Sequence, residues 1–181
     1  MIYVFLANGF EECEAITPID CLRRAGKQVV TVGIGGKVIT GAHQIPVTAD
    51  VTEDAVVLDK NVEMIVLPGG MPGTLNLGQN ETVQKAVQFC SEQNKWIAAI
   101  CAAPSILGRA GLLKGKKATA YPGFERDLSG AKLSHDTVCV DGKIITAKGA
   151  GVALEFGLKL VECLLSKEVR KSLAEKMICK K

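Results

Sequence analysis

The sequence predicts an α/β protein, a three-layer α/β/α sandwich in which helices cover both faces of a mostly parallel sheet, with a small hairpin added off that sheet. Apolar runs of strand length alternate along the chain with segments whose apolar residues recur at helical spacing. The runs are continuously apolar, which is typical of strands buried on both faces. A length of 181 residues fits one core, so we expect a single domain over residues 1–181.

The first half of the chain predicts three strands, two helices and the added hairpin. The first helix accommodates Pro18 because proline fits the opening turns of a helix, and it ends at Gly26. Two short alternating pieces on either side of Gly41 and Ala42 indicate the hairpin. The expected elements are strands at 2–7, 28–34 and 62–67, helices at 14–26 and 80–93, and the hairpin at 36–50.

The second half continues the alternation and ends on two helices. Asp141-Gly142 lies between two strand-like pieces, and this dipeptide is a strong signal for a hairpin turn. The expected elements are strands at 96–101 and 117–121, a hairpin at 137–147, and helices at 151–165 and about 167–178. A further helix is expected to follow the strand at 96–101 and to end in the Gly111 region.

The composition argues against several classes of protein. The net charge is +3 and the cations are scattered, so nucleic-acid binding is not expected. The chain has no apolar run of membrane-spanning length and no signal-peptide pattern, so we expect no membrane span and a cytoplasmic location. Its seven cysteines form no Cys-x-x-Cys pair and only two histidines accompany them, so we expect no metal site and no cofactor.

Candidate site residues follow the carboxyl ends of the predicted strands. They are Asn8 to Glu12 after the first strand, the Pro68-Gly69-Gly70 turn after the strand at 62–67, and Cys101 after the strand at 96–100. Tyr121-Pro122-Gly123 is a further candidate. Because ligands bind beyond the carboxyl ends of parallel strands, we expect these segments to converge.

Cys101 is the strongest single candidate. It lies where an apolar strand meets a helical pattern that opens with Ala102, Ala103 and Pro104. The N–H groups at the start of a helix favour a nearby negative charge, so this position predicts a thiolate. The same strand-to-helix corner presents the nucleophile in hydrolase-type elbows. The alternative is a buried core cysteine at a tight corner, because free cysteine is often buried.

Several groups could assist such a thiolate. The N–H groups of Gly70 and Ala102 could form an oxyanion hole, although a Pro-Gly-Gly turn also ends many ordinary strands. Glu11 and Glu12 are best explained as first-turn acids that complement the helix dipole. Glu14 differs if it points inward toward Cys101, because a carboxyl beside an anionic sulfur would have a raised pKa and could act as a general acid or base.

Four segments carry a resemblance to a known family: NGFEECEAITPIDCLRRAG (8–26), VLPGGMPGTLNL (66–77), AAICAAPSILGRAGLLKGKKAT (98–119) and IITAKGAGVALEFGLKLVE (144–162). Together they resemble the ThiJ/PfpI superfamily, a class I glutamine amidotransferase-like group, and within it the parkinsonism-associated deglycase branch. Tyr121 stands where animal members often carry a histidine, which makes the chain similar to bacterial members.

The resemblance implies a flavodoxin-like fold and a homodimer. It places the reactive cysteine at Cys101, its protonated carboxyl partner at Glu14 and the oxyanion donors at Gly70 and Ala102. Gly69 and Tyr121 join the residues expected to contact substrate. With Tyr121 in place of histidine, a histidine-dependent proton relay is not expected, because the ordinary pKa of tyrosine is near 10.

Three functions remain open at this stage. The first is a cysteine-dependent enzyme, similar to glyoxalases and deglycases, that acts on a small reactive carbonyl such as methylglyoxal in stress protection. The second is a redox-sensing cysteine protein or chaperone in which Cys101 is oxidised to a sulfinate. The third is a peptidase or amidase, which is weaker because neither His43 nor His135 is an obvious partner for the cysteine.

Overall fold

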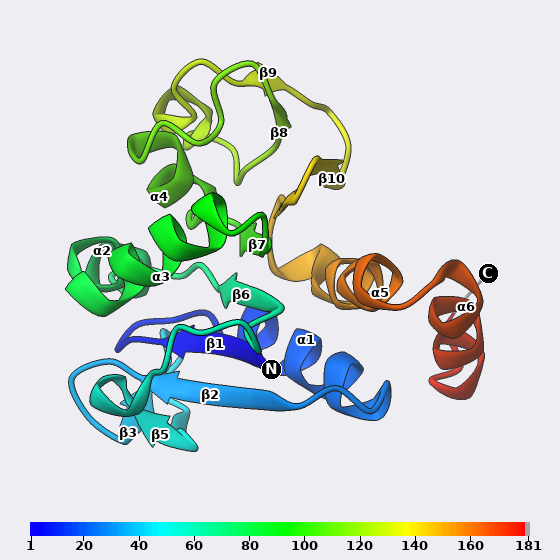
Figure 1. Cartoon of the computed structure of the whole chain (residues 1–181), viewed down its shortest axis with the longest axis horizontal. Helices are drawn as coiled ribbons and strands as arrows, with labels where there is room; N and C mark the ends of the chain where they lie inside the picture. The colour runs from blue at the N-terminus through cyan, green and yellow to red at the C-terminus, as the bar shows by residue number, and fades with distance from the viewer. Residues whose placement is uncertain (180–181) are drawn as a thin grey trace.

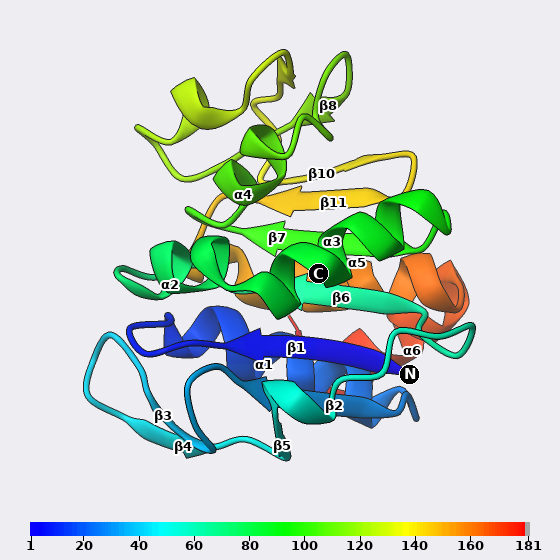
Figure 2. The ribbon, with the colours of Figure 1, turned by 60° about the vertical axis from the view of Figure 1, so that its left-hand side comes forward.

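The computed structural model describes residues 1–179 and confirms the α/β architecture. The main sheet has seven strands in the order β10-β11-β7-β6-β1-β2-β5. Each neighbouring pair is parallel except β10 and β11. Figure 2 shows these strands stacked across the molecule, with β10 at the top and β2 and β5 at the bottom. This is the layered α/β arrangement that the sequence pattern predicts, and the flavodoxin-like fold that the family resemblance implies.

The strands of the main sheet are short and mostly buried. Their bounds are β1 (Ile2–Leu6), β2 (Val29–Gly33), β5 (Val51–Thr52), β6 (Met64–Leu67), β7 (Trp96–Ile100), β10 (Val138–Asp141) and β11 (Ile144–Ala147). Two small sheets lie beside it. They pair β3 (Val38–Thr40) with β4 (Pro46–Thr48), and β8 (Lys117–Ala118) with β9 (Lys132–Leu133).

Helices cover both faces of the sheet, as Figure 1 shows. One layer holds α2 (Gly73–Gln79), α3 (Glu81–Glu92) and α4 (Pro104–Arg109), and the other holds α1 (Glu12–Arg24), α5 (Ala153–Leu164) and α6 (Lys167–Lys176). Three short 3-10 turns lie at Glu53–Ala55, Glu125–Asp127 and Ala150–Val152.

Alternation along β1 divides the core between these two layers. Ile2, Val4 and Leu6 pack in the cluster that includes the buried faces of α1 and α5. Tyr3 and Phe5 pack in the cluster beneath α3 and α4. Successive side chains of a strand point to opposite faces, so a continuously apolar strand requires a cover on both sides.

The structure adds elements that the sequence pattern does not predict. Helix α2 follows directly on the 68–72 turn, and its seven residues are too few to show a clear helical period. Strands β5 and β9 have two residues each, so they have no measurable alternation. The predicted hairpin at 36–50 is confirmed as the separate β3–β4 ribbon.

Candidate active site

Cys101 lies at the corner between β7 and α4, as predicted. Its φ is +65°, in the left-handed region that residues other than glycine rarely adopt. The backbone on both sides is tied down: the Cys101 N–H donates to the Ala147 carbonyl at 2.9 Å, and the Tyr121 N–H donates to the Cys101 carbonyl at 2.9 Å. Strain of this kind persists only where the surroundings impose it, and it lifts the side chain out of the sheet as in a nucleophile elbow.

The Pro68-Gly69-Gly70 turn lies against this corner. A Cβ placed on Gly69 would be 2.6 Å from the Cβ of Cys101 and 2.6 Å from Oε2 of Glu14, so only glycine fits between the two side chains. Gly70 has φ +87°. The backbone N–H groups of Gly70 and Ala102 both act on the Cys101 sulfur. The structure thus brings together the four predicted positions Cys101, Gly69, Gly70 and Ala102.

Glu14 reaches the same point from the first turn of α1. Its side chain is only 1% exposed, and Oε2 accepts a hydrogen bond from the Gly69 N–H at 2.9 Å. The Cys101 thiol is also close enough to lower the pKa of this carboxyl. Within residues 1–179, the buried Oε1 makes no standard hydrogen bond. A buried carboxylate oxygen without a donor is costly, so this environment favours the protonated acid.

Electrostatics confirm that Glu14 is unusual. Burial raises its pKa to about 7, and the nearby Glu11 carboxylate adds to the rise, while hydrogen bonds with Cys101 and backbone N–H groups oppose it. Burial raises the pKa of Cys101 to about 12, and the charge of Glu14 adds to that rise. The N–H groups of Gly70 and Ala102 act in the opposite direction.

The thiol is therefore not acidified by the helix end alone, contrary to the simplest expectation from its position. Helix α4 has six residues, and Cys101 is packed against a second acid. Two acids in contact titrate as a pair, and each raises the pKa of its neighbour when it is charged. These two pKa values place a single shared proton mainly on the sulfur. The reactive form, with the proton on Glu14 and a thiolate that faces the carboxyl and two N–H groups, is therefore the less populated one.

Tyr121 lies at the edge of this site, and its side chain is half-exposed. Its backbone N–H bonds to Cys101, and its ring approaches Gly149: a Cβ on Gly149 would be 3.3 Å from Cδ2 of Tyr121 and 3.7 Å from Oε1 of Glu14. Tyr121 is thus close enough to Glu14 to contact a ligand held there. His135 is exposed, and its carbonyl accepts a hydrogen bond from Lys148. Among the described residues, no hydrogen bond links His135 to Cys101 or Glu14.

Sequence reasoning missed the segment that follows β11. Ala147 accepts the Cys101 N–H, Gly149 borders Glu14, and the backbone of Ala150 is close enough to lower the pKa of Glu14. The signal was present, because β11 is a parallel neighbour of β7 and its carboxyl end must meet the same edge of the sheet.

A second polar cluster borders the site. Oε2 of Glu12 lies 2.7 Å from Nδ1 of His43, and Oε1 of Glu12 accepts the His43 N–H at 2.8 Å. Potential ligand atoms of Glu11, Glu12 and His43 lie within 4.8 Å of one another. Such a group could hold a metal ion, but Glu12 and His43 already bind each other and exposed acidic groups commonly gather without an ion, so we assign no metal to it.

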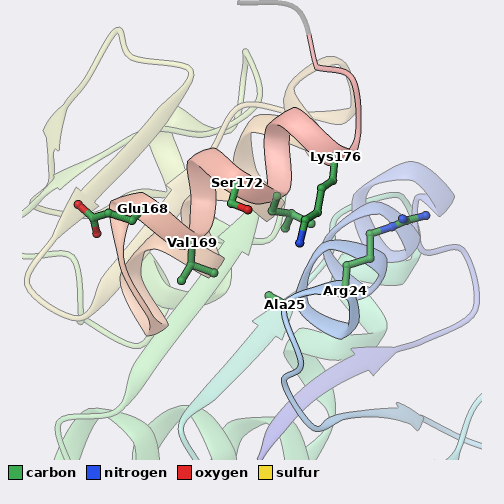
Figure 3. A pocket seen from close by; sticks show the side chains of 7 residues that line it. Arg24, Ala25, Glu168, Val169, Ser172 and Lys176 are labelled. Atoms are coloured by element: carbon green, nitrogen blue, oxygen red, sulfur yellow. The ribbon is translucent and has the colours of Figure 1, made fainter.

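The larger hollows described on the surface do not coincide with Cys101. One of about 410 Å³ lies between the C-terminal end of α1 and α6, and Arg24, Ser172 and Lys176 line it (Figure 3). Arg24 is ten residues beyond Glu14, about 15 Å along the helix at 1.5 Å per residue. The Cys101 site is instead formed where the 68–70 turn and the first turn of α1 pack around a partly exposed cysteine. None of the helices in the described part of the chain is long and apolar enough to cross a membrane.

The fold and the site together define a class of protein: a flavodoxin-like α/β protein that holds a cysteine at a strand-to-helix corner against a buried carboxyl. A family model for the DJ-1/PfpI family matches residues 1–163, and the chain belongs to that family.

Known relatives are similar in sequence to most or nearly all of this chain. Protein dj-1beta of Drosophila melanogaster is 36% identical over 178 residues, which cover 97% of this chain and 95% of the relative. Deglycase PfpI of Pyrococcus furiosus is 36% identical over 148 residues, or 80% of this chain and 87% of the relative. A solved structure of oxidized Toxoplasma gondii DJ-1 has a TM-score of 0.93 and 37% identity, and the match covers 98% of this chain and 97% of that one.

Proposed function

We propose that this protein is a cysteine-dependent enzyme that acts on small reactive carbonyls of the methylglyoxal type. The observation that carries the proposal is the placement of the Cys101 sulfur between a buried carboxyl with a raised pKa and two backbone N–H groups. A group whose pKa is shifted close to neutral suits proton transfer at physiological pH. The similarity to Deglycase PfpI supports the same class of chemistry.

The proposed reaction begins with the proton on Glu14 and the charge on Cys101. The thiolate attacks the aldehyde carbon, and the new oxyanion is stabilised by the N–H groups of Gly70 and Ala102. Glu14 gives its proton to that oxygen, which completes a hemithioacetal. The Glu14 carboxylate then takes the hydrogen of this carbon as a proton and returns it to the neighbouring carbonyl carbon, while protons redistribute between the two oxygens.

This isomerisation leaves a thioester. Water adds to the thioester carbonyl, the bond to sulfur breaks, and lactate leaves as the thiol is restored. The overall change is methylglyoxal plus water to lactate, so no external oxidant or reductant is needed. Glu14 suits these proton transfers because its Oε1 has no standard hydrogen-bond donor in residues 1–179 and lies beside Gly149.

The test is conversion of methylglyoxal to lactate by the purified protein, followed by the Cys101→Ser variant. Removal of a nucleophile typically costs several orders of magnitude, so we expect the variant to lose lactate formation by about a thousandfold or more. A Cys101→Ser variant with full turnover would contradict the mechanism. A wild-type protein that forms no lactate, with methylglyoxal or its early adducts, would contradict the proposed function itself.

Redox sensing is the second candidate, and the similarity to a DJ-1 solved in an oxidized form favours it. Peroxide would oxidise the Cys101 thiolate first to a sulfenate and a second peroxide would give the sulfinate, each with transfer of one oxygen and release of water or hydroxide. Mass spectrometry after mild peroxide tests this candidate. Oxidation of Cys101 no faster than that of Cys90 or Cys139 would refute it.

A homodimer is also part of the proposal. Helix α1 presents Cys13 and Ile16 at its surface, and Ile16 is 42% exposed. An interface between two copies on this face of α1 would cover both side chains. Sedimentation equilibrium gives the mass directly, and a mass of one chain at micromolar concentration would contradict this part of the proposal.

A further inference from the structure

The start of α1 carries three acidic side chains, the N-cap Glu11 and the first-turn residues Glu12 and Glu14, and each has a different environment. Glu14 is buried against Cys101. Glu12 is 8% exposed and is bound to His43. Glu11 is partly exposed, and the reaction described above assigns it no role.

Glu11 completes a ring of three hydrogen bonds with Glu14 and with Gly69 of the Pro68-Gly69-Gly70 turn. The Glu11 N–H donates to the Gly69 carbonyl at 3.0 Å, the Gly69 N–H donates to Oε2 of Glu14 at 2.9 Å, and the Glu14 N–H donates to Oε2 of Glu11 at 2.8 Å. The last bond is also the N-cap of α1. The Glu11 side chain therefore fixes the position of the Glu14 carboxyl relative to Gly69 and, through it, relative to Cys101.

The charge of Glu11 acts unequally on the two members of the pair. It raises the pKa of Glu14, and Oε2 of Glu11 lies 2.8 Å from the backbone nitrogen of Glu14. A negative charge that is closer to the carboxyl than to the thiol favours the arrangement in which the carboxyl is neutral and the sulfur carries the charge. The charge of Glu11 therefore increases the share of the thiolate form of Cys101.

Other charged groups around this turn modify the effect. Glu12 and His43 lie beside Glu11, and the hydrogen bond with Glu12 raises the pKa of His43. A protonated His43 partly offsets the acidic charge at low pH. Cys13 lies on the same turn, with a pKa that Glu11 raises, and Tyr121 borders Glu14 from the opposite side. Of these groups, Glu11 alone bonds to the Glu14 backbone in the described structure.

We propose that Glu11 is a positioning residue for the Cys101–Glu14 pair: its side chain holds Glu14 against Gly69, and its negative charge shifts the shared proton from the sulfur toward Glu14. This inference deepens the proposed function, since it concerns the thiolate on which that reaction rests.

The test is the pH dependence of Cys101 alkylation by iodoacetamide, measured by mass spectrometry on the peptide that contains it. Glu11→Gln keeps an oxygen that can accept the Glu14 N–H but removes the charge. We expect the alkylation rate between pH 6 and 8 to fall about three- to tenfold, with the thermal midpoint nearly unchanged, because Coulomb effects of this size act between partly buried groups. Glu11→Asp, which keeps both the charge and a capping oxygen, should restore most of the rate.

Glu81→Gln is the matched control. Glu81 is an exposed first-turn acid of α3, so its removal changes the net charge by the same amount far from Cys101. We expect the control to alkylate like the wild type. A Glu11→Gln profile that superimposes on the wild-type profile would overturn the inference, and so would an equal drop in Glu81→Gln.

The readout separates this inference from the proposed function. A wild-type protein that forms no lactate but shows the Glu11→Gln shift in alkylation supports the role of Glu11 and refutes the enzyme. A protein that forms lactate but shows no shift supports the enzyme and refutes the role of Glu11.

Discussion

Cys101 and Cys90 flank the same strand, and burial raises the pKa of both thiols to about 12. Cys90 lies at the end of α3, before β7, and is fully buried in the core. Its pKa is raised by burial alone, with Lys95 acting in the opposite direction. Cys101 lies just after β7, is partly exposed, and shares its environment with Glu14 and two backbone N–H groups.

The comparison shows that two thiols with the same raised pKa can differ in reactivity. Burial in the core is what raises the pKa of Cys90, so this thiol behaves as a small apolar side chain. The Cys101 proton has an acceptor in contact with it, and the donors needed to stabilise the resulting thiolate are already in place. Reactivity is therefore decided by the neighbours of the sulfur and by its access to solvent.

The largest expected contrast is in the alkylation rates of these two cysteines. At pH 8 in native conditions, we expect iodoacetamide to modify Cys101 about a thousandfold faster than Cys90, because Cys90 reacts only when the core opens. Quantitative peptide mass spectrometry gives both rates in one sample. Equal rates in the folded protein would remove the distinction, and equal rates in denaturant provide the control.

The next contrast concerns stability and pH through Glu14. Its folded pKa of about 7 lies above its ordinary value of 4.5, so the folded protein binds this proton more tightly than the unfolded chain does. The favourable contribution is fully present below pH 4.5 and is lost as the pH rises through 7. Relative to Glu14→Gln, the wild type should lose up to about 3 kcal/mol of unfolding free energy across this window.

Urea denaturation of both proteins at several pH values measures that difference. The comparison with Glu14→Gln cancels every other titrating group, so the remaining slope belongs to Glu14 and its partner. A difference that does not change between pH 4 and 8 would show that Glu14 keeps an ordinary pKa.

A steric contrast tests the turn beside Cys101. Gly69→Ala places a methyl group 2.6 Å from the Cβ of Cys101 and should cost about 1–3 kcal/mol of stability. It should also displace Glu14 and reduce activity. Gly78→Ala in α2 is the matched control, because its methyl group would meet Ile106 at an ordinary 3.5 Å and should stabilise the helix by about 0.5–1 kcal/mol.

Thermal denaturation should show a lower melting temperature for Gly69→Ala and a higher one for Gly78→Ala. Lactate formation should fall only in Gly69→Ala. A Gly69→Ala variant as stable and active as the wild type would show that the turn is free to move away from Cys101.

The smallest expected effect is at Tyr121. If its half-exposed hydroxyl orients substrate, Tyr121→Phe should raise KM about two- to fivefold with kcat nearly unchanged, as for the loss of one partly solvated hydrogen bond. Tyr3→Phe is the control: the Tyr3 hydroxyl bonds to the Val57 backbone at 3.2 Å, away from the site, so its loss should lower stability and leave KM unchanged. A drop in kcat for Tyr121→Phe would instead place this hydroxyl in the chemical step.

The sequence by itself determined the layered α/β architecture and singled out Cys101. Continuous apolar strands such as Ile2–Leu6 require a cover on both faces, and a cysteine after a buried strand must lie at the carboxyl edge of the sheet. These are local or topological consequences of the pattern. Short elements such as α2 and β5 were not predicted, because their few residues show no period.

Only the tertiary structure decided how Cys101 is tuned. Three features depend on contacts between residues far apart in the chain: Glu14 is buried, Gly69 lies between the two side chains, and Glu11 and the segment after β11 complete the site. The position after the strand predicted an acidic thiol, whereas the structure pairs the thiol with a second acid. A pKa depends on burial and on neighbouring charges in space, and neither can be read from the order of residues along the chain.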